Sequence, residues 1–435
     1  MKVYFNKKLF TEEDIFTYLT GLIFLSLYFV NSKFVFDIGV KITIADIVIL
    51  GTLILFLFNF FRKDSKIQIH IPIIVFVAYI VFILIVGLDI RRVSWPARNF
   101  SLLIMCLRNV FLMIVVSDFK LGVYRGLKII VNISIVVSVI SSILYFFYLL
   151  QYPKILLNQS LWHPGIWYFF GESSLLRLSG LGNDPNFFGA INGIGFIFCL
   201  FLCDEKKYQI GATLIFLSII LTFSRTLFII GTLVLIFTIF SFKLVKSNII
   251  KKVCTNYFKI CIFLIIIGIL FSVLVPSVDL VGLISERMKS GIENISIHRF
   301  QLWSAAISAF KKSPLLGQGG RYIQMTEGNY VHNDYLEILS SYGLLGFFVM
   351  VVFLLGNLKL GILSLTNSIK IGAYILLVIY MIFMMGFTIF FNPYIYFIIG
   401  LLWGNGYKDE YLEIGDDKLY GKKTDYYFSD YNNLR

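Results

Sequence analysis

Residues 331–355 read VHNDYLEILSSYGLLGFFVMVVFLL, a polar start followed by a long apolar run. Four polar residues open the stretch, namely His332, Asn333, Asp334 and Glu337. A helix needs roughly 20 apolar residues to cross the hydrocarbon of a bilayer, and this stretch is long enough to do so. Because ionisable groups near hydrocarbon are costly, the four polar residues require a structural or chemical reason.

The whole chain has the composition of a membrane protein. Of its 435 residues 58% are hydrophobic and 14% are charged, and the apolar residues form long unbroken runs. We therefore predict an all-α polytopic membrane protein, with about twelve transmembrane helices in a single domain over residues 1–405. The predicted helices cover residues 15–31, 43–61, 70–88, 100–117, 127–150, 187–203, 208–223, 226–242, 257–276, 334–357, 371–390 and 392–405. Residues 406–435 are expected to form a disordered cytoplasmic tail.

The net charge of +13 is distributed as expected for membrane topology rather than for nucleic-acid binding. Lys and Arg cluster after even-numbered predicted helices, so those loops and both termini are predicted to be cytoplasmic. The clusters lie within residues 62–66, 120–128, 206–207 and 243–252. Loops after odd-numbered helices then face outward, although Arg91, Arg92 and Arg98 in one such loop depart from the rule.

The sequence contains no motif for a cofactor or a tightly held metal. None of the five cysteines lies in a predicted outward loop, and their spacing matches neither a disulfide framework nor a zinc site. HExxH, Walker and dinucleotide-binding glycine patterns do not occur. We therefore expect no cofactor, no metal and no nucleic-acid partner.

Two long outward stretches, 151–186 and 277–333, are the expected place for function. The second contains ISIHRFQLWSAAISAFKKSP from Ile295 to Pro314, in which Phe300, Trp303, Ile307 and Phe310 recur at helical spacing. This pattern predicts an amphipathic helix that lies on the membrane or caps the bundle. The GQGG sequence that follows, at 317–320, is interpreted as a flexible turn.

Three arginines occur where an anion could bind on the outer side. Arg225 and Arg299 fall in the first turns of predicted helices, where a cation is disfavoured unless an anion is bound. Arg177 precedes a Gly-Asn-Asp-Pro turn, in which Asp184 can cap and Pro185 can start a helix. The alternative for each arginine is an interfacial anchor whose charged end reaches water.

Several neighbouring positions have simpler structural interpretations. Capping is the preferred role for Asp184 and Asn186, and the turn explains Gly180 and Gly182. Arg108, midway along the predicted fourth helix, is different. A central charge costs about 2.5 to 3.5 kcal/mol on insertion scales, so Arg108 needs a partner or a wet cavity, and the sequence does not identify either.

The polar start of the opening stretch divides into two parts. Asp334 and Glu337, three residues apart, have the spacing of a capping box for the helix that follows. His332 has no such role, and a helix N-terminus disfavours the imidazolium form. A neutral imidazole can act as a general base, so His332 is a catalytic candidate, with unreactive loop filler as the alternative.

Four motifs in order resemble the O-antigen ligase and polymerase-like family of bacterial membrane proteins. They are RLSGLGNDPN, LTFSRT, the Arg299 helix ending in SPLLGQGG, and HNDYLEILSSYGLLG, and the resemblance covers about residues 170–350. It implies a helical glycosyltransferase of the GT-C type in the inner, or cytoplasmic, membrane. Such an enzyme takes a saccharide from a polyprenyl diphosphate carrier, such as undecaprenyl diphosphate, on the outer face.

The resemblance also implies residue roles and partners. Arg225 and Arg299 would hold the diphosphate, Arg177 would assist, and His332 would deprotonate the acceptor hydroxyl without a metal. Supporting positions would be Asn333, Glu337, Asn186 and Arg108. The implied partners are the lipid-linked donor, a glycan or lipid-linked acceptor, membrane lipid, and a chain-length regulator or other polysaccharide assembly proteins.

The sequence favours a polymerase of lipid-linked repeat units, because the second outward loop is of modest length. A ligase that passes the finished glycan to a lipid A core or another anchor needs the same donor site and remains the alternative. A secondary transporter is the rival from another class. Its substrate site would be expected near the midplane between repeated halves, and we find no such repeat.

Overall fold

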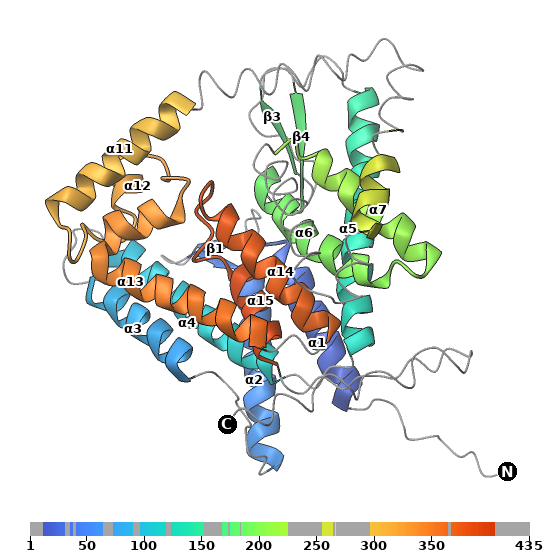
Figure 1. Cartoon of the computed structure of the whole chain (residues 1–435), viewed down its shortest axis with the longest axis horizontal. Helices are drawn as coiled ribbons and strands as arrows, with labels where there is room; N and C mark the ends of the chain where they lie inside the picture. Colours follow the sequence, from blue (N-terminus) through green and yellow to red (C-terminus); the bar gives the residue numbers. More distant parts are fainter. Residues whose placement is uncertain are drawn as a thin grey trace.

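The structure is a computed structural model of the whole chain, and it consists mainly of helices (Figure 1). The residues that it describes are 12–30, 35–37, 41–63, 73–89, 96–118, 123–151, 168–172, 175–182, 184–224, 255–263, 266, 296–363 and 367–404. Arg225, the predicted eighth helix, most of the ninth helix and the predicted tail at 406–435 lie outside this part of the chain.

Helices occupy the other predicted membrane segments. The helices with their bounds are α1 (Glu12–Leu27), α2 (Ile44–Lys63), α3 (Ile73–Asp89), α4 (Pro96–Ser117), α5 (Val123–Gln151), α6 (Pro185–Leu202), α7 (Lys206–Ile220), α11 (Ser296–Lys312), α12 (Tyr322–Glu327), α13 (Asp334–Leu363), α14 (Ser368–Phe383) and α15 (Pro393–Trp403). The sequence predicted helices only, but two short antiparallel hairpins also occur. They pair β1 (Val35–Asp37) with β2 (Lys41–Thr43), and β3 (Tyr168–Glu172) with β4 (Leu175–Gly180).

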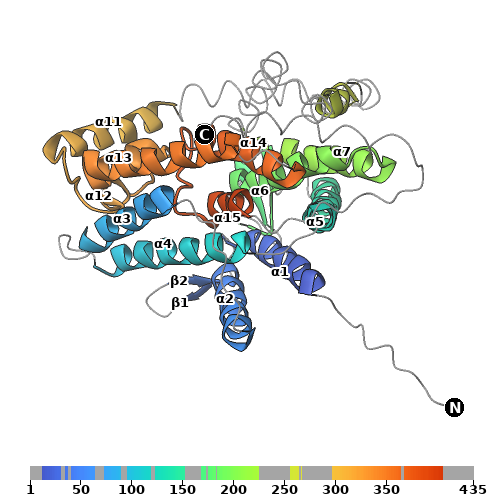
Figure 2. The same ribbon diagram turned by 60° about the horizontal axis from the view of Figure 1, so that its bottom comes forward.

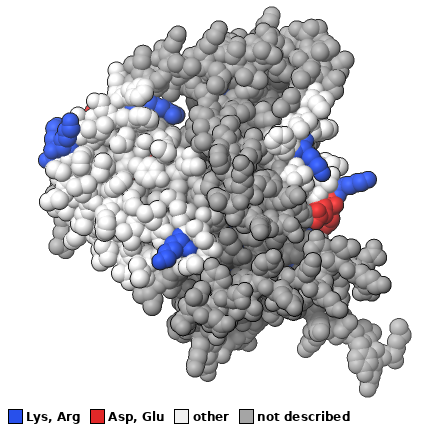
Figure 3. Space-filling view, viewed as in Figure 1, with Lys and Arg blue, Asp and Glu red and all other residues white. Residues whose placement is uncertain are grey.

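Four of the described helices are long and apolar enough to cross a membrane, in agreement with a helical membrane protein. They contain the spans Phe100–Ser117, Val123–Phe147, Pro185–Leu202 and Asp334–Leu363, and α1, α2, α3, α14 and α15 include shorter apolar stretches. Twelve transmembrane helices therefore remain a prediction. Figure 3 shows that the described surface around α3 and α13 is almost free of charged side chains on one face. Large apolar side chains such as Ile74 and Phe348 are exposed there, as expected for contact with lipid.

Helix α15 forms the centre of the bundle (Figures 1 and 2). Every residue from Pro393 to Trp403 is buried, because this helix is apolar on all sides and packs against α4 and α14. A Cβ atom at Gly400 would lie 2.8 Å from the Val116 side chain, so the glycine permits the close approach of α15 to α4. This packing fixes the position at which the chain enters α15.

Helix α13 is broken at Gly343, where φ is 63° and ψ is −162°. The segment 314–319 docks at the break and supplies the missing hydrogen bonds. The Gln318 and Gly319 amides donate to the carbonyls of Ser340 and Ser341, each over 2.9 Å. On the far side of the break, the Leu344 and Leu345 amides donate to the carbonyls of Pro314 and Leu315. The break is thereby satisfied within the protein, as backbone near a membrane must be.

The GQGG sequence is therefore a packed segment, and its interpretation as a flexible turn is wrong. A Cβ at Gly317 would lie 2.3 Å from the backbone of Ser341, and a Cβ at Gly343 would lie 2.4 Å from the backbone of Leu315. Both glycines also have positive φ angles. The close contact between the two segments therefore explains Gly317 in the motif SPLLGQGG and Gly343 in the motif SSYGLLG.

Helices α11 and α12 form a small module with its own core on the start of α13. This core contains Leu302, Ala306, Ala309, Ile323 and Val331. The predicted apolar face of α11 packs only in part: Trp303 lies against this core, whereas Phe300 is 62% exposed and Ile307 is 42% exposed, as the prediction of a helix on the membrane allows. Helix α11 has two adjoining apolar faces, and the one with small residues lies against the protein because it allows closer packing.

Candidate active site

The polar start of α13 is organised differently from the predicted capping box. Asn333 caps the helix, since its Oδ1 accepts a hydrogen bond from the Leu336 amide over 3.1 Å. Asp334 instead holds the segment between α14 and α15: its Oδ2 accepts from the Ile389 and Phe390 amides over 2.8 and 2.9 Å. The capping box of Asp334 and Glu337 was therefore a wrong prediction, because the partners of Asp334 lie 55 and 56 residues further on.

The segment 384–391 is fastened to α13 along its length. In addition to the bonds from Asp334 Oδ2, the Asp334 amide donates to the Met384 carbonyl over 2.8 Å. The Asn333 side-chain amide donates to the Met385 carbonyl, and the Tyr335 hydroxyl donates to the Met381 carbonyl just before the segment. The sequence analysis placed residues 384–390 inside the predicted helix 371–390 because they are largely apolar, but α14 ends at Phe383 and that part of the prediction is wrong.

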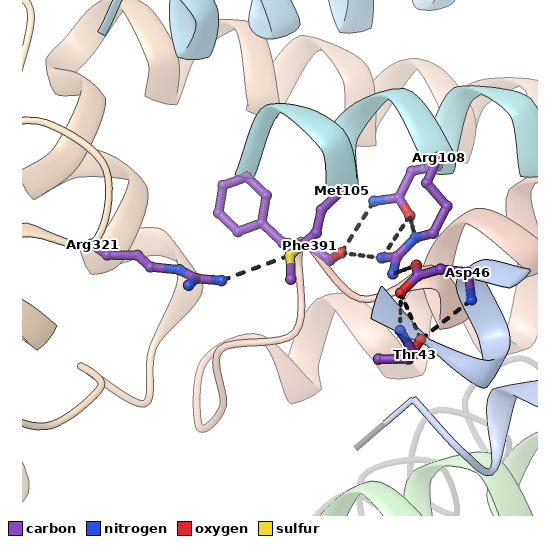
Figure 4. Close-up of polar contacts among 7 residues, drawn as sticks. Thr43, Asp46, Met105, Arg108, Arg321 and Phe391 are labelled. Carbon is purple, nitrogen blue, oxygen red and sulfur yellow. Dashed lines mark hydrogen bonds and ion pairs between the residues drawn. The ribbon is translucent and has the colours of Figure 1, made fainter. Parts of the chain in front are cut away.

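Glu337 is buried beside the break in α13. Its Oε1 accepts from the Ser341 hydroxyl over 3.2 Å, whereas its Oε2 has no hydrogen-bond partner. Arg321, the N-cap of α12, lies within electrostatic range of this carboxyl group. Arg321 also reaches Met105 of α4, and its side chain approaches the sulfur to 3.7 Å (Figure 4). Arg321 was not among the predicted site residues, and no sequence motif singled it out.

His332 is half-buried and has a positive φ of 53°, which is unusual for a residue with a side chain. The backbone before it is held by Trp303 of α11, whose indole N–H donates to the Val331 carbonyl over 3.1 Å. Burial is the main cause that lowers the pKa of His332 to about 4, and the nearby Arg299 and His298 contribute to this decrease. The imidazole is thus neutral at neutral pH, as predicted, although burial rather than the helix terminus is the main cause.

Arg299 lies in the first turn of α11, and its guanidinium carbon is 5.8 Å from the centre of the Phe387 ring. This is within the range of a cation–π contact. Its neighbour His298 contacts the Asn329 side-chain amide, with Nε2 and Nδ2 3.3 Å apart. The structure therefore brings together Arg299 and His332, two of the predicted site residues, and adds Phe387, which the sequence did not suggest.

Arg177 and Asn186 meet at a different corner of the protein, where β4 approaches the end of α7. Arg177 is 6% exposed, its Nε donates to the Thr222 carbonyl over 2.8 Å, and its guanidinium also donates to Asn186 Oδ1 over 3.1 Å. The Leu178 amide donates to the Leu221 carbonyl. Arg177 thus links Thr222 in the LTFSRT motif, three residues before Arg225, to Asn186 at the start of α6.

The predicted start of α6 is confirmed for Asp184 and Pro185, whereas the predicted capping role of Asn186 is wrong because its side chain accepts from Arg177. Asp184 is the N-cap, its side chain accepts from the Asn186 amide over 2.7 Å, and Pro185 occupies the first helical position. Burial raises the pKa of Asp184 above its usual value, while this hydrogen bond and the charge of Arg177 act in the opposite direction. Gly180 has a φ of 61° and provides the predicted turn.

Arg108 has the partner that the sequence could not identify. It forms an ion pair with Asp46 over 2.7 Å and donates to the Phe391 carbonyl over 3.0 Å (Figure 4). Asp46 is in turn bound to Thr43, whose amide and hydroxyl both donate to Asp46 Oδ2 at the start of α2. A buried charge with such partners is explained by structure, and Arg108 contacts the end of the 384–391 segment rather than His332.

The chemistry available here is proton transfer beside a cationic group. A neutral half-buried imidazole can accept a proton, and the adjacent guanidinium can stabilise a developing anion. Within the described residues, no group of three or more His, Cys, Asp or Glu side chains is placed to hold a metal ion. The arrangement is of the kind used for transfer to a hydroxyl group from a donor with an anionic leaving group.

A membrane-embedded transferase is the class of protein that this helical fold and this pairing of residues suggest. The family model described as O-antigen ligase matches residues 210–351, and this match confirms the resemblance to the O-antigen ligase and polymerase-like family over that region. The matched region includes Arg225, Arg299 and His332, whereas Arg177, Arg108 and the segment 384–391 lie outside it. No curated protein matches the chain.

Proposed function

We propose that the protein is a polymerase of lipid-linked polysaccharide repeat units, such as those of an O-antigen, a capsule or an exopolysaccharide. The observation that carries the proposal is the neutral His332 beside Arg299 within the region that matches O-antigen ligases. The donor would be a glycan on polyprenyl diphosphate. The acceptor would be a sugar hydroxyl of the next lipid-linked unit, on the outer face of the bacterial inner membrane.

In the proposed reaction His332 takes the proton of the acceptor hydroxyl while its oxygen attacks the anomeric carbon of the donor. The new bond joins that oxygen to the anomeric carbon, and the bond from the anomeric carbon to the diphosphate oxygen breaks. The polyprenyl diphosphate leaves with the electron pair, and Arg299 and Arg225 stabilise its charge. A single displacement of this kind inverts the anomeric centre and needs no metal, because the diphosphate is already a good leaving group.

The low pKa of His332 fits such a donor. The positive charge of Arg299 contributes to lowering this pKa. A bound diphosphate would neutralise part of that charge and raise the pKa of His332 towards its ordinary value. The base would therefore become stronger when the donor is in place.

The second candidate is an O-antigen ligase, and the description of the matching family favours it. Electrophoresis of surface glycan from a strain without the protein separates the two. Single repeat units on the normal anchor indicate a polymerase, and long chains stranded on the lipid carrier indicate a ligase. Unchanged glycan would contradict both and favour the transporter. A strain that carries wild-type protein on a plasmid is the control.

The proposed orientation places the α11–α12 module outside and both termini in the cytoplasm. In a variant without native cysteines, Lys312→Cys should react with an impermeant thiol reagent in intact cells or spheroplasts, and Lys206→Cys should not. Both native lysines are exposed, so accessibility within the fold is matched. Labelling of Lys206→Cys alone would contradict an outward-facing site.

A further inference from the structure

An aromatic residue that contacts Arg299 lies outside the region matched by the family model. Phe387 of segment 384–391 is 4% exposed, and the guanidinium carbon of Arg299 lies 5.8 Å from the centre of its ring. The ring also stacks on Phe383 of α14, with the ring centres 4.4 Å apart. This stacking on α14 fixes the position of the Phe387 ring, which also lies within cation–π range of the Arg299 guanidinium.

The rest of the segment is held by contacts at both ends. At one end the Asp334 amide and the Asn333 side chain donate to the carbonyls of Met384 and Met385. At the other end Asp334 Oδ2 accepts from the Ile389 and Phe390 amides. Phe387 lies between these two anchors. The residues next to His332 thus fix the backbone that carries the ring beneath Arg299.

The far end of the segment is fixed independently of α13. The Phe391 carbonyl accepts from Arg108 over 3.0 Å and from the Asn109 side chain over 3.2 Å. Arg108 is itself paired with Asp46. Arg108, oriented by this ion pair, therefore holds the end of segment 384–391 that leads into α15.

We propose that Phe387 is a positioning residue for the diphosphate-binding arginine, and that segment 384–391 couples Arg299 to His332. The ring attracts the positive charge of the guanidinium and does not need its N–H groups as hydrogen-bond donors. The ring can therefore fix Arg299 without competing as an acceptor for its N–H groups. An acidic residue at position 387 would fix the arginine too, but it would compete with the diphosphate for it. The inference rests on the proposed function, because it assumes that Arg299 binds the donor.

The test measures binding of undecaprenyl diphosphate to purified protein in nanodiscs. Phe387→Leu should weaken binding about 2- to 30-fold, the range expected for loss of a cation–π contact of about 0.5 to 2 kcal/mol. Phe387→Tyr should restore it, because the ring face is kept. The matched control is Phe198→Leu, which removes a similarly buried ring from α6 and has no described contact with Phe387 or Arg299.

A double-mutant cycle with Arg299→Ala separates positioning from general packing. If the ring acts through Arg299, adding Phe387→Leu to Arg299→Ala should cause little further loss of binding. Additive losses, or equal losses in Phe387→Leu and Phe198→Leu, would overturn the inference while leaving the proposed function intact. If Arg299→Ala alone binds undecaprenyl diphosphate as tightly as the wild type, the diphosphate site itself is wrong.

Discussion

Two arginine sites of this protein differ in how their guanidinium groups are used. Arg177 is buried and donates to the Thr222 carbonyl and to Asn186 Oδ1, so these hydrogen bonds hold backbone and side chain together. Arg299 lies partly exposed on the Phe387 ring beside His332. Two arginines that both lie near loops therefore differ in the contacts that their guanidinium groups make. Arg177 makes structural hydrogen bonds, whereas Arg299 is the arginine that we propose to bind the donor.

The largest effect is expected at His332. His332→Gln keeps a polar side chain but cannot take up the proton, and loss of a general base typically lowers the rate about 10²- to 10⁴-fold. Binding of the donor should survive, because Arg299 is unchanged. The measurement is elongation of a purified lipid-diphosphate repeat unit, together with donor binding. A native rate would show that the base lies elsewhere, and lost binding would assign His332 to the diphosphate site.

The next largest effect should distinguish two aspartates that start helices in the two regions. Asp184→Ala removes an ordinary cap and should cost about 1 kcal/mol of stability. Asp334→Ala leaves the buried Ile389 and Phe390 amides without an acceptor, and each such loss costs about 1 to 3 kcal/mol. Thermal unfolding in detergent should therefore show the larger decrease for Asp334→Ala. Equal decreases would mean that segment 384–391 is not held by Asp334.

A smaller and more selective effect is expected when each arginine is replaced by lysine. Arg299→Lys keeps the charge but loses the planar fork, so donor binding should weaken about tenfold with unchanged thermal stability. Arg177→Lys should show the reverse: a lower unfolding temperature, because lysine cannot reach both the Thr222 carbonyl and Asn186 Oδ1. The comparison between the two sites fails if both variants lose mainly binding or mainly stability.

The smallest effect concerns pH. The folded pKa of His332 is about 4, below its unfolded value of 6.5, so the unfolded chain binds more protons between these values. Stability from this group is complete above about pH 6.5 and decreases as the pH falls towards 4. The acid limb of kcat/KM should lie near pH 4. Arg299→Ala should move it upward, whereas Lys311→Ala, which removes an exposed cation from the same helix, should not. An unmoved limb in Arg299→Ala would separate the two residues electrostatically.

What could be predicted from the sequence depended on distance along the chain. The cap of α6 was predictable because Asp184, Pro185 and Asn186 are adjacent. The partners of Asp334 and Arg108 were not, because they are brought there by tertiary packing from 55 and 62 residues away. Local spacing made Asp334 resemble a capping residue, and only the position of segment 384–391 reveals its actual partners.

The packing face of α11 could be predicted only in part, for another reason. Its apolar residues cover more than one side, so helical periodicity alone cannot decide which side is buried. The larger side chains suggested the face of Phe300 and Ile307, whereas close packing on α13 selected the face of Leu302 and Ala306. The class of membrane protein was easier to predict, because long apolar runs indicate it whatever the tertiary contacts of each helix are.

The break at Gly343 has a consequence for how the protein is made. After the break, Leu344 to Leu363 form a helix of about 30 Å at about 1.5 Å per residue, which equals the thickness of the hydrocarbon layer. Asp334 and Glu337 therefore need not enter lipid when this helix is inserted. The docking segment 314–319 precedes α13 in the chain, so it is already synthesised when the break forms. The half of α13 before the break can then fold directly onto this segment, and the backbone groups at the break find their hydrogen-bond partners within the same part of the chain.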